Sequence, residues 1–183
     1  MNYADIKKVD VANGEGVRVS IFVSGCHHHC KGCFNECAWD FSYGNKFDEN
    51  AKEKVINYMN HDYIKGLSLL GGEPLEPSNQ EGLLPLVKEV KEKFPDKTIW
   101  CYTGYDFQKD IVDGMNKTNP TTKELLKYID VVVDGKFDEN QKSPKLRFRG
   151  SANQRILDAQ ETIKEDKPVE IPSLYEKDRP TFK

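Results

Sequence analysis

Four cysteines and three histidines lie within a dozen positions of one another, in the stretch SGCHHHCKGCFNECAW at residues 24–39. Cys26, Cys30 and Cys33 have the spacing C-x3-C-x2-C, and Cys37 follows them. Thiolates are soft ligands that bind zinc and iron–sulfur clusters, and paired thiols can also form disulfides. The density of cysteines therefore predicts either a metal centre or a disulfide on this short stretch.

The bulk composition decides between these two possibilities. The chain has 27 Lys and Arg against 30 Asp and Glu, a net charge of −3, so we expect neither nucleic acid nor a membrane as partner. Its N-terminus lacks the apolar core of a signal peptide, and no apolar run is long enough to span a bilayer. We therefore expect a cytoplasmic protein whose thiols stay reduced. Five cysteines, four of them clustered, then indicate metal ligands.

Two kinds of metal centre fit the cysteine stretch. A structural zinc site could use Cys26, Cys30, Cys33 and Cys37, or a histidine in place of one cysteine, which would make the protein a non-catalytic zinc-binding module. Structural zinc, however, usually joins two separated pairs of ligands, whereas all the candidates here lie on one loop. Three thiolates from one compact loop suit three corners of an iron–sulfur cube instead. Such a cluster would have one iron without a protein ligand.

The elements that must position this loop alternate between strand-like and helix-like segments. Short runs rich in β-branched and apolar residues predict strands at 18–24, 66–70, 98–103 and 130–137, with a fifth candidate at 146–151. Apolar residues at helical spacing predict helices at 49–59 after an Asp48 cap, from Leu83 to Phe94, and near 106–116, 122–128 and 153–165.

This alternation predicts an α/β fold with a mostly parallel sheet, whose active site lies at the carboxyl ends of the strands. A closed eight-stranded barrel needs about 250 residues. A chain of 183 residues can therefore form at most an incomplete βα barrel, of about five to six parallel strands. We expect residues 1–158 to form this domain. We expect residues 159–183 to form a C-terminal extension that is bound to the surface or flexible, because most of it, residues 164–183, is charged, contains prolines and lacks clear periodicity.

Two further motifs follow predicted strands. In GGEP, Gly71 and Gly72 would let the backbone approach a ligand closely, and their exposed carbonyls could accept hydrogen bonds from an ammonium group. Glu73 would either add negative charge beside that group or form a hydrogen bond that fixes the turn. In DGK, Asp134 and Lys136 are two residues apart at a strand end, so both could face one zwitterionic ligand. A surface ion pair between them is the alternative, and spacing alone does not separate the two.

The cysteine spacing after the first strand of a βα protein resembles the radical S-adenosylmethionine (SAM) superfamily. The resemblance extends to the activating enzymes of anaerobic (class III) ribonucleotide reductases. Five segments carry it in the expected order, up to about residue 158, namely VSGCHHHCKGCFNECAW, LLGGEPL, WCYTGY, VVVDGKF and RFRGSANQR.

This resemblance implies the cofactors and their ligands. Cys26, Cys30 and Cys33 would bind a [4Fe–4S] cluster whose free iron chelates the amino and carboxyl groups of SAM, and Cys37 would lie outside the set. The SAM contacts would be Gly32, Cys33, Phe34, Gly71, Gly72, Glu73, Thr103, Asp134 and Lys136. Five late polar residues are further candidates for contacts with SAM or the partner, although a solvated face would show the same pattern: Arg147, Arg149, Asn153, Gln154 and Arg155. Consecutive histidines cannot all face a cluster, so His27–His29 are expected to face solvent or to form hydrogen bonds near it.

The resemblance also implies the reaction. A reduced cluster would deliver one electron to SAM and cleave it to methionine and a 5′-deoxyadenosyl radical, which removes hydrogen from a glycine in the large reductase subunit. An electron donor such as flavodoxin or ferredoxin would be a second partner. A pyruvate formate-lyase-type activase shares this chemistry and is the nearest alternative. The short chain and the segment RFRGSANQR favour the reductase activator.

Overall fold

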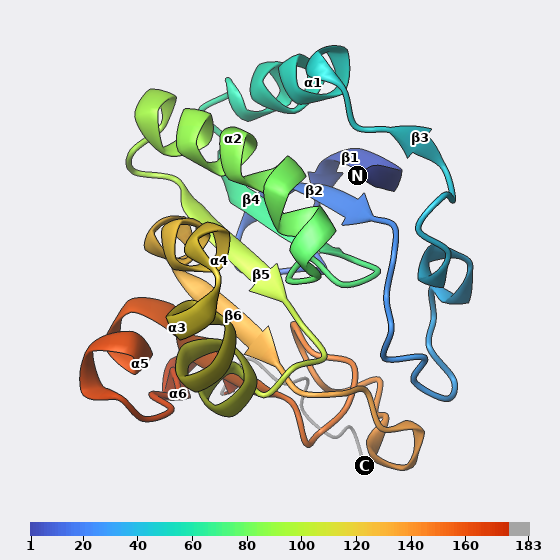
Figure 1. Cartoon of the computed structure of the whole chain (residues 1–183), viewed down its shortest axis with the longest axis vertical. Coiled ribbons are helices and arrows are strands. Elements are labelled where there is room, and N and C mark those ends of the chain that lie inside the picture. Colours follow the sequence, from blue (N-terminus) through green and yellow to red (C-terminus); the bar gives the residue numbers. More distant parts are fainter. Residues whose placement is uncertain (176–183) are drawn as a thin grey trace.

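The computed structural model describes residues 1–175, and its centre is a single β-sheet (Figure 1). The seven strands are β1 (Asn2–Asp10), β2 (Val17–Val23), β3 (Asn45–Lys46), β4 (Ile64–Gly71), β5 (Thr98–Tyr102), β6 (Val131–Asp134) and β7 (Arg155–Asp158). They lie in the order β3-β1-β2-β4-β5-β6-β7, so the sheet is open. β2, β4, β5 and β6 pair in parallel, whereas β1, β3 and β7 pair antiparallel to their neighbours.

The α/β class is therefore confirmed, but the number of parallel strands is not: four strands are parallel instead of five or six. The predicted strand at 146–151 is wrong. Phe148 in that segment has a φ of 61°, a left-handed conformation that cannot continue a strand. The strand forms at Arg155–Asp158 instead, where Ile156 and Leu157 are fully buried.

The helices are α1 (Glu49–Met59), α2 (Pro77–Lys93), α3 (Asn116–Thr118), α4 (Pro120–Leu125), α5 (Ala159–Glu165) and α6 (Pro172–Tyr175), with a π-helix at Phe107–Met115. Short 3-10 helices lie at Glu36–Trp39, Leu126–Tyr128 and Glu139–Gln141. The predicted helix at 49–59 is confirmed, and the Asp48 side chain caps it by accepting from the Ala51 N–H at 3.0 Å. The predicted helix at 153–165 is correct only from Ala159 onward, because β7 occupies its first half.

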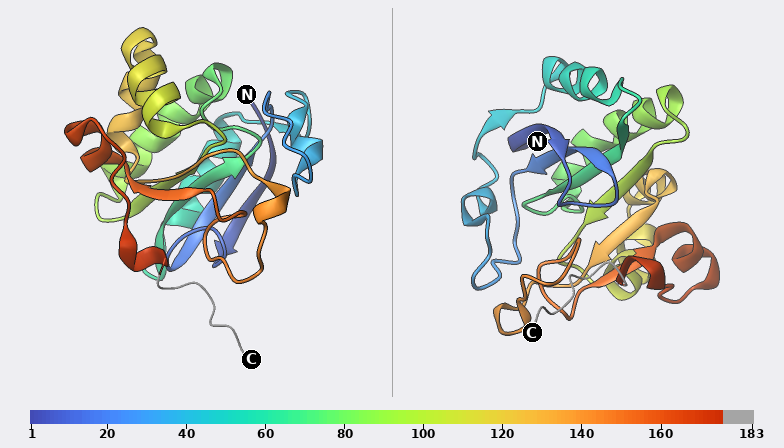
Figure 2. Two further views of the ribbon diagram at one scale, coloured as in Figure 1. Left: turned by 90° about the horizontal axis from the view of Figure 1, so that it is seen from below. Right: turned by 180° about the vertical axis from the view of Figure 1, so that it is seen from behind.

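The two faces of the sheet have different partners. Side chains alternate along each strand, so Leu69 on β4 and Cys101 on β5 face the main core with helices α1, α2 and α4. Leu70, Trp100 and Tyr102 alternate with them and face the other way. That second face carries a smaller apolar cluster and the pocket described below. Figure 2 shows α1, α2 and α4 on one side of the sheet and the long segment before β7 crossing the other.

The chain continues past β7 and returns along the sheet. The Asp158 N–H donates to the Val169 carbonyl at 2.9 Å, and the Ile171 N–H donates to the Ile156 carbonyl at 3.0 Å. Of the predicted extension, residues 176–183 lie outside the described part, and the domain boundary at residue 158 stays a prediction. Within residues 1–175, none of the helices is long and apolar enough to cross a membrane.

Candidate functional site

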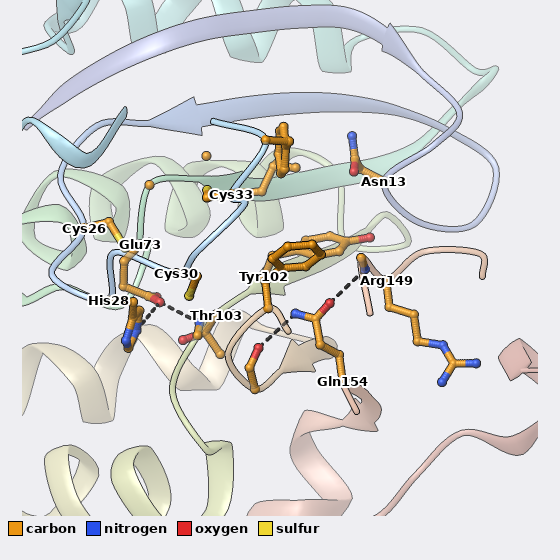
Figure 3. A pocket seen from close by; sticks show the side chains of 18 of the residues that line it. Asn13, Cys26, His28, Cys30, Cys33, Glu73, Tyr102, Thr103, Arg149 and Gln154 are labelled. Atoms are coloured by element: carbon orange, nitrogen blue, oxygen red, sulfur yellow. Dashed lines mark hydrogen bonds and ion pairs between the residues drawn. The ribbon is translucent and has the colours of Figure 1, made fainter. Parts of the chain in front are cut away.

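A pocket of about 340 Å³ opens at the carboxyl ends of the parallel strands (Figure 3). Most of the predicted site residues line it: Cys26, Cys30, Gly32, Cys33, Phe34, Gly71, Gly72, Glu73 and Thr103. Phe34 is 80% exposed and therefore lies at the rim. The strand ends of β4 and β5 and the loop after β2 thus converge on one space, as the parallel topology predicts.

The cysteine loop folds back on itself directly after β2. Gly25 has a φ of 99°, and its N–H donates to the Ala38 carbonyl at 2.8 Å. A Cβ at Gly25 would come within 2.2 Å of the Phe41 ring, so glycine is required there. The Cys26 N–H donates to the Trp39 carbonyl at 3.2 Å. These bonds close the loop and hold the cysteines at the strand end.

The histidines between the first two cysteines anchor this loop. His27 Nδ1 lies 3.0 Å from a carboxylate oxygen of Glu76, at the start of α2. The His29 ring stacks on Trp39 with a centroid distance of 4.6 Å. His27 therefore joins the loop to the start of α2, whereas His29 packs within the loop, on the residue whose carbonyl closes it. The sequence pattern did not specify either contact.

The Glu73 side chain joins three segments that line the pocket. Its carboxylate accepts from the Leu75 N–H at 2.9 Å and the Gly104 N–H at 2.7 Å, and it lies 3.0 Å from His28 Nε2 (Figure 3). The residue is only 1% exposed. Glu73 thereby joins the loop that carries the cysteines to the turns after β4 and β5. The sequence suggested two roles for Glu73, and one of them, a hydrogen bond that fixes the GGEP turn, is present in the bond from the Leu75 N–H.

The three predicted ligands fit an iron–sulfur cluster. Burial raises the pKa of Cys26 to about 11. Burial also raises the pKa of Cys30, and a hydrogen bond from the Phe137 N–H acts in the opposite direction. The Asn35 N–H donates to Cys33 Sγ at 3.4 Å. Backbone N–H groups directed at sulfur are a regular feature of iron–sulfur sites, and the thiols lie together at one end of a pocket that an open iron could face.

The other two cysteines lie elsewhere. Cys37 is exposed, does not line the pocket, and its thiol contacts Asn35 Oδ1 at 3.4 Å. Cys101 is fully buried in the main core, where burial raises the pKa of its thiol well above the usual value. Among residues 1–175, no three His, Cys, Asp or Glu side chains converge on a point that would hold a single metal ion.

Asp134 and Lys136 do not face one ligand, contrary to the expectation from their spacing. The Asp134 carboxylate is fully buried and accepts from the Phe107 N–H at 2.8 Å and from Arg155 Nε at 2.9 Å. Lys136 is exposed and lines a neighbouring hollow. The strand ends at Asp134, and Gly135 then turns the chain with a φ of 97°, so the alternation of a strand no longer applies.

The structure adds pocket residues that the sequence interpretation did not select. Asn13, from the loop between β1 and β2, and Phe148 line the pocket. Gln154, one of the late polar candidates, bridges two lining segments: its side chain donates to the Gly135 carbonyl at 2.9 Å and accepts from the Gly150 N–H at 2.8 Å. Loop residues of this kind carry no periodicity, and only the turn-forming sequence ANGEG could have drawn attention to Asn13.

The fold and the three-thiol pocket define a class of α/β iron–sulfur protein, and comparison with known proteins agrees. Residues 12–157 match the family model described as a 4Fe-4S single cluster domain. This match favours an iron–sulfur cluster over the zinc alternative.

Curated relatives narrow the class further. The relative from Haemophilus influenzae is 48% identical over 158 residues, which cover 85% of this chain and 97% of the relative. The relative from Enterobacteria phage T4 is 44% identical, over 85% of this chain and 93% of the relative. The relative from Escherichia coli K12 is 40% identical, over 85% of this chain and 97% of the relative. Each is named anaerobic ribonucleoside-triphosphate reductase-activating protein. The chain belongs to this family, and the predicted resemblance is confirmed.

Proposed function

We propose that this chain is a radical SAM activase that reductively cleaves SAM and generates the glycyl radical on the large subunit of an anaerobic ribonucleotide reductase. The observation that carries the proposal is the position of Cys26, Cys30 and Cys33, which together line one end of a pocket about 340 Å³ in volume. A cluster held by three thiols there has one open iron with space for a ligand beside it. The names of the relatives support the choice of reductase as partner.

The chain's own residues bind and orient the cofactors in this proposal. The three cysteines hold one [4Fe–4S] cluster, which supplies a single electron to SAM when it is bound. In this proposal, the backbone of Gly71 and Gly72 contacts SAM. A Cβ on Gly72 would come within 2.6 Å of the Gly25 carbonyl oxygen, so the turn after β4 touches the cysteine loop only because this residue is glycine. Glu73 fixes both turns relative to the cysteines.

The open sheet suits a macromolecular substrate. Four parallel strands with antiparallel edges form an incomplete βα barrel in this proposal, so the pocket opens to solvent on one side. A radical formed there would react with solvent or reductant unless something covered it. The reductase loop that carries the glycine supplies both the substrate and the cover. A flavodoxin or ferredoxin in the cytoplasm supplies the electron.

Lys136→Ala should weaken SAM binding while the cluster is retained. Lys136 lies close enough to the cluster ligands for its charge to act on the Cys30 thiol, whose pKa burial raises and Lys136 lowers. In this proposal its ammonium group binds the SAM carboxylate. Loss of such a charge-assisted bond should cost about 2 kcal/mol, or roughly thirtyfold in Kd. Equilibrium binding of SAM to anaerobically reconstituted protein measures this.

Lys109→Ala is the matched control, because Lys109 lines the same hollow as Lys136. We expect the Kd for SAM to stay within twofold or so of the wild type, as for other surface charges. Equal affinities for wild type and Lys136→Ala would remove Lys136 from the SAM site.

The dependence of SAM cleavage on the partner tests the proposed function. With reductant alone we expect slow formation of 5′-deoxyadenosine, and with the large reductase subunit we expect faster cleavage that is coupled to one radical per event. Equal rates of 5′-deoxyadenosine formation with and without the large subunit would argue against a macromolecular substrate.

A further inference from the structure

The chain extends beyond the region that the family comparisons match. The 4Fe-4S domain match ends at residue 157, and the curated relatives are 93–97% covered by matches that span only 85% of this chain. The segment after β7 is described as far as Tyr175 and contains α5 and α6. It packs on the molecule rather than projecting from it, which raises the question of what its contacts do.

The last described residues lie on the sheet face that carries the pocket. Leu174 is 5% exposed and belongs to the small apolar cluster with Trp100, Val133 and Ile156. The Tyr175 hydroxyl accepts from the Ile156 N–H at 2.8 Å, which fixes the ring beside β7. α6 is therefore attached to the sheet by both apolar packing and a hydrogen bond.

The same cluster supports one wall of the pocket. Phe148 and Arg149 both line the pocket, and in Figure 3 Arg149 lies at the end away from the cysteines. The Phe148 ring meets the Trp100 ring edge to face at a centroid distance of 5.5 Å. The Arg149 guanidinium lies 4.5 Å from the centroid of the Tyr175 ring. In Figure 3 the Arg149 side chain extends away from the cysteines, so its backbone faces the pocket and its charge points outward.

This wall needs support from outside itself. Phe148 has a φ of 61°, a left-handed conformation that is unfavourable for residues other than glycine and persists only where surrounding contacts hold it. The flanking residues 144–150 form turns and bends with no paired strand. The Trp100 ring contacts Phe148, and the Tyr175 ring contacts the Arg149 guanidinium. These two contacts join the segment to the sheet and to α6.

We infer that Leu174 and Tyr175 are positioning residues for the pocket: they brace the Phe148–Arg149 wall from behind and so set the shape of the space that the ligand enters. The segment beyond the matched domain thereby becomes part of the site without touching the ligand. That this space receives SAM rests on the proposed function. That Leu174 and Tyr175 hold the Phe148–Arg149 wall in place does not.

Limited proteolysis of the full chain tests the brace directly. Trypsin cleaves after Arg147 and Arg149, and mass spectrometry of the fragments ending at these residues gives the rate. Tyr175→Leu removes the ring under Arg149 and the hydroxyl at Ile156, and we expect cleavage to be about tenfold faster. Tyr175→Phe keeps the ring and should remain within about twofold of the wild type. An unchanged rate in Tyr175→Leu would overturn the inference.

Ligand affinity provides the second readout, on the reconstituted holoprotein. Tyr175→Leu should raise the Kd for SAM about fivefold, and Tyr175→Phe should not. Tyr63→Leu is the control for loss of a tyrosine: Tyr63 is 48% exposed and stacks on His61, away from the pocket. A lower melting temperature of Tyr175→Leu with an unchanged rate of trypsin cleavage would mean that Tyr175 only stabilises the fold, and it would contradict the inference. If the wild type failed to bind SAM, the proposed function would fail, and the trypsin rates would still decide the brace.

Discussion

Alanine in place of Cys26, Cys30 or Cys33 should abolish binding of the iron–sulfur cluster in each of the three variants. These thiols line one end of the pocket, and a cube with one open iron leaves no spare protein ligand. We expect about four iron atoms per chain in the reconstituted wild type, and close to none in the variants. Iron and sulfide content, together with the visible absorbance of anaerobically reconstituted protein, measure this loss.

Cys37→Ala and Cys101→Ala are the controls, and both should retain the cluster. Cys37 is exposed and lies outside the pocket, and Cys101 faces the main core. Loss of iron in Cys37→Ala, with retention in Cys26→Ala, would contradict the ligand assignment and would favour the spacing Cys30-x2-Cys33-x3-Cys37.

Glu73→Ala should lower the free energy of unfolding of the metal-free protein by on the order of 3 kcal/mol. The substitution leaves the buried N–H of Leu75 and the half-buried N–H of Gly104 without an acceptor, and His28 loses its partner at 3.0 Å. Each unpaired buried group carries a desolvation penalty that apolar packing does not offset. Urea denaturation of the metal-free protein gives this difference without contributions from the cluster.

Glu139→Ala is the matched surface control for Glu73. Glu139 is exposed and pairs with the exposed Lys31 at 3.3 Å, a contact that contributes little to stability. Similar unfolding free energies for the two variants would mean that the carboxylate of Glu73 does not join the three segments. Glu73→Gln, which keeps the size and one acceptor oxygen, should fall between Glu73→Ala and the wild type.

Much of the site could be predicted from the sequence because its chemistry is concentrated in local motifs. The cysteine spacing and the GGEP turn are each contiguous, and the parallel topology brings the strand ends that carry them to one edge. Helix α1 was predictable to its exact ends because Asp48 caps it and its apolar residues repeat at helical spacing.

The parts that could not be predicted depend on contacts between distant segments. Asp134 has the spacing of a ligand-binding residue, but its carboxylate bonds Arg155, which lies 21 residues further along the chain. The sequence RILD reads as part of a helix, yet it forms β7 because pairing with β6 buries Ile156 and Leu157. Phe148 enters the pocket wall through a left-handed backbone conformation that no periodic pattern signals.

Electron paramagnetic resonance of the complete system tests the central claim most directly. The reconstituted protein is incubated anaerobically with SAM, a reductant and the large subunit of an anaerobic ribonucleotide reductase, and the spectrum is recorded. The proposed function predicts a glycyl radical signal on the large subunit that requires SAM and is lost with Cys26→Ala. A protein that holds its cluster and binds SAM but forms no glycyl radical on the large subunit would contradict it.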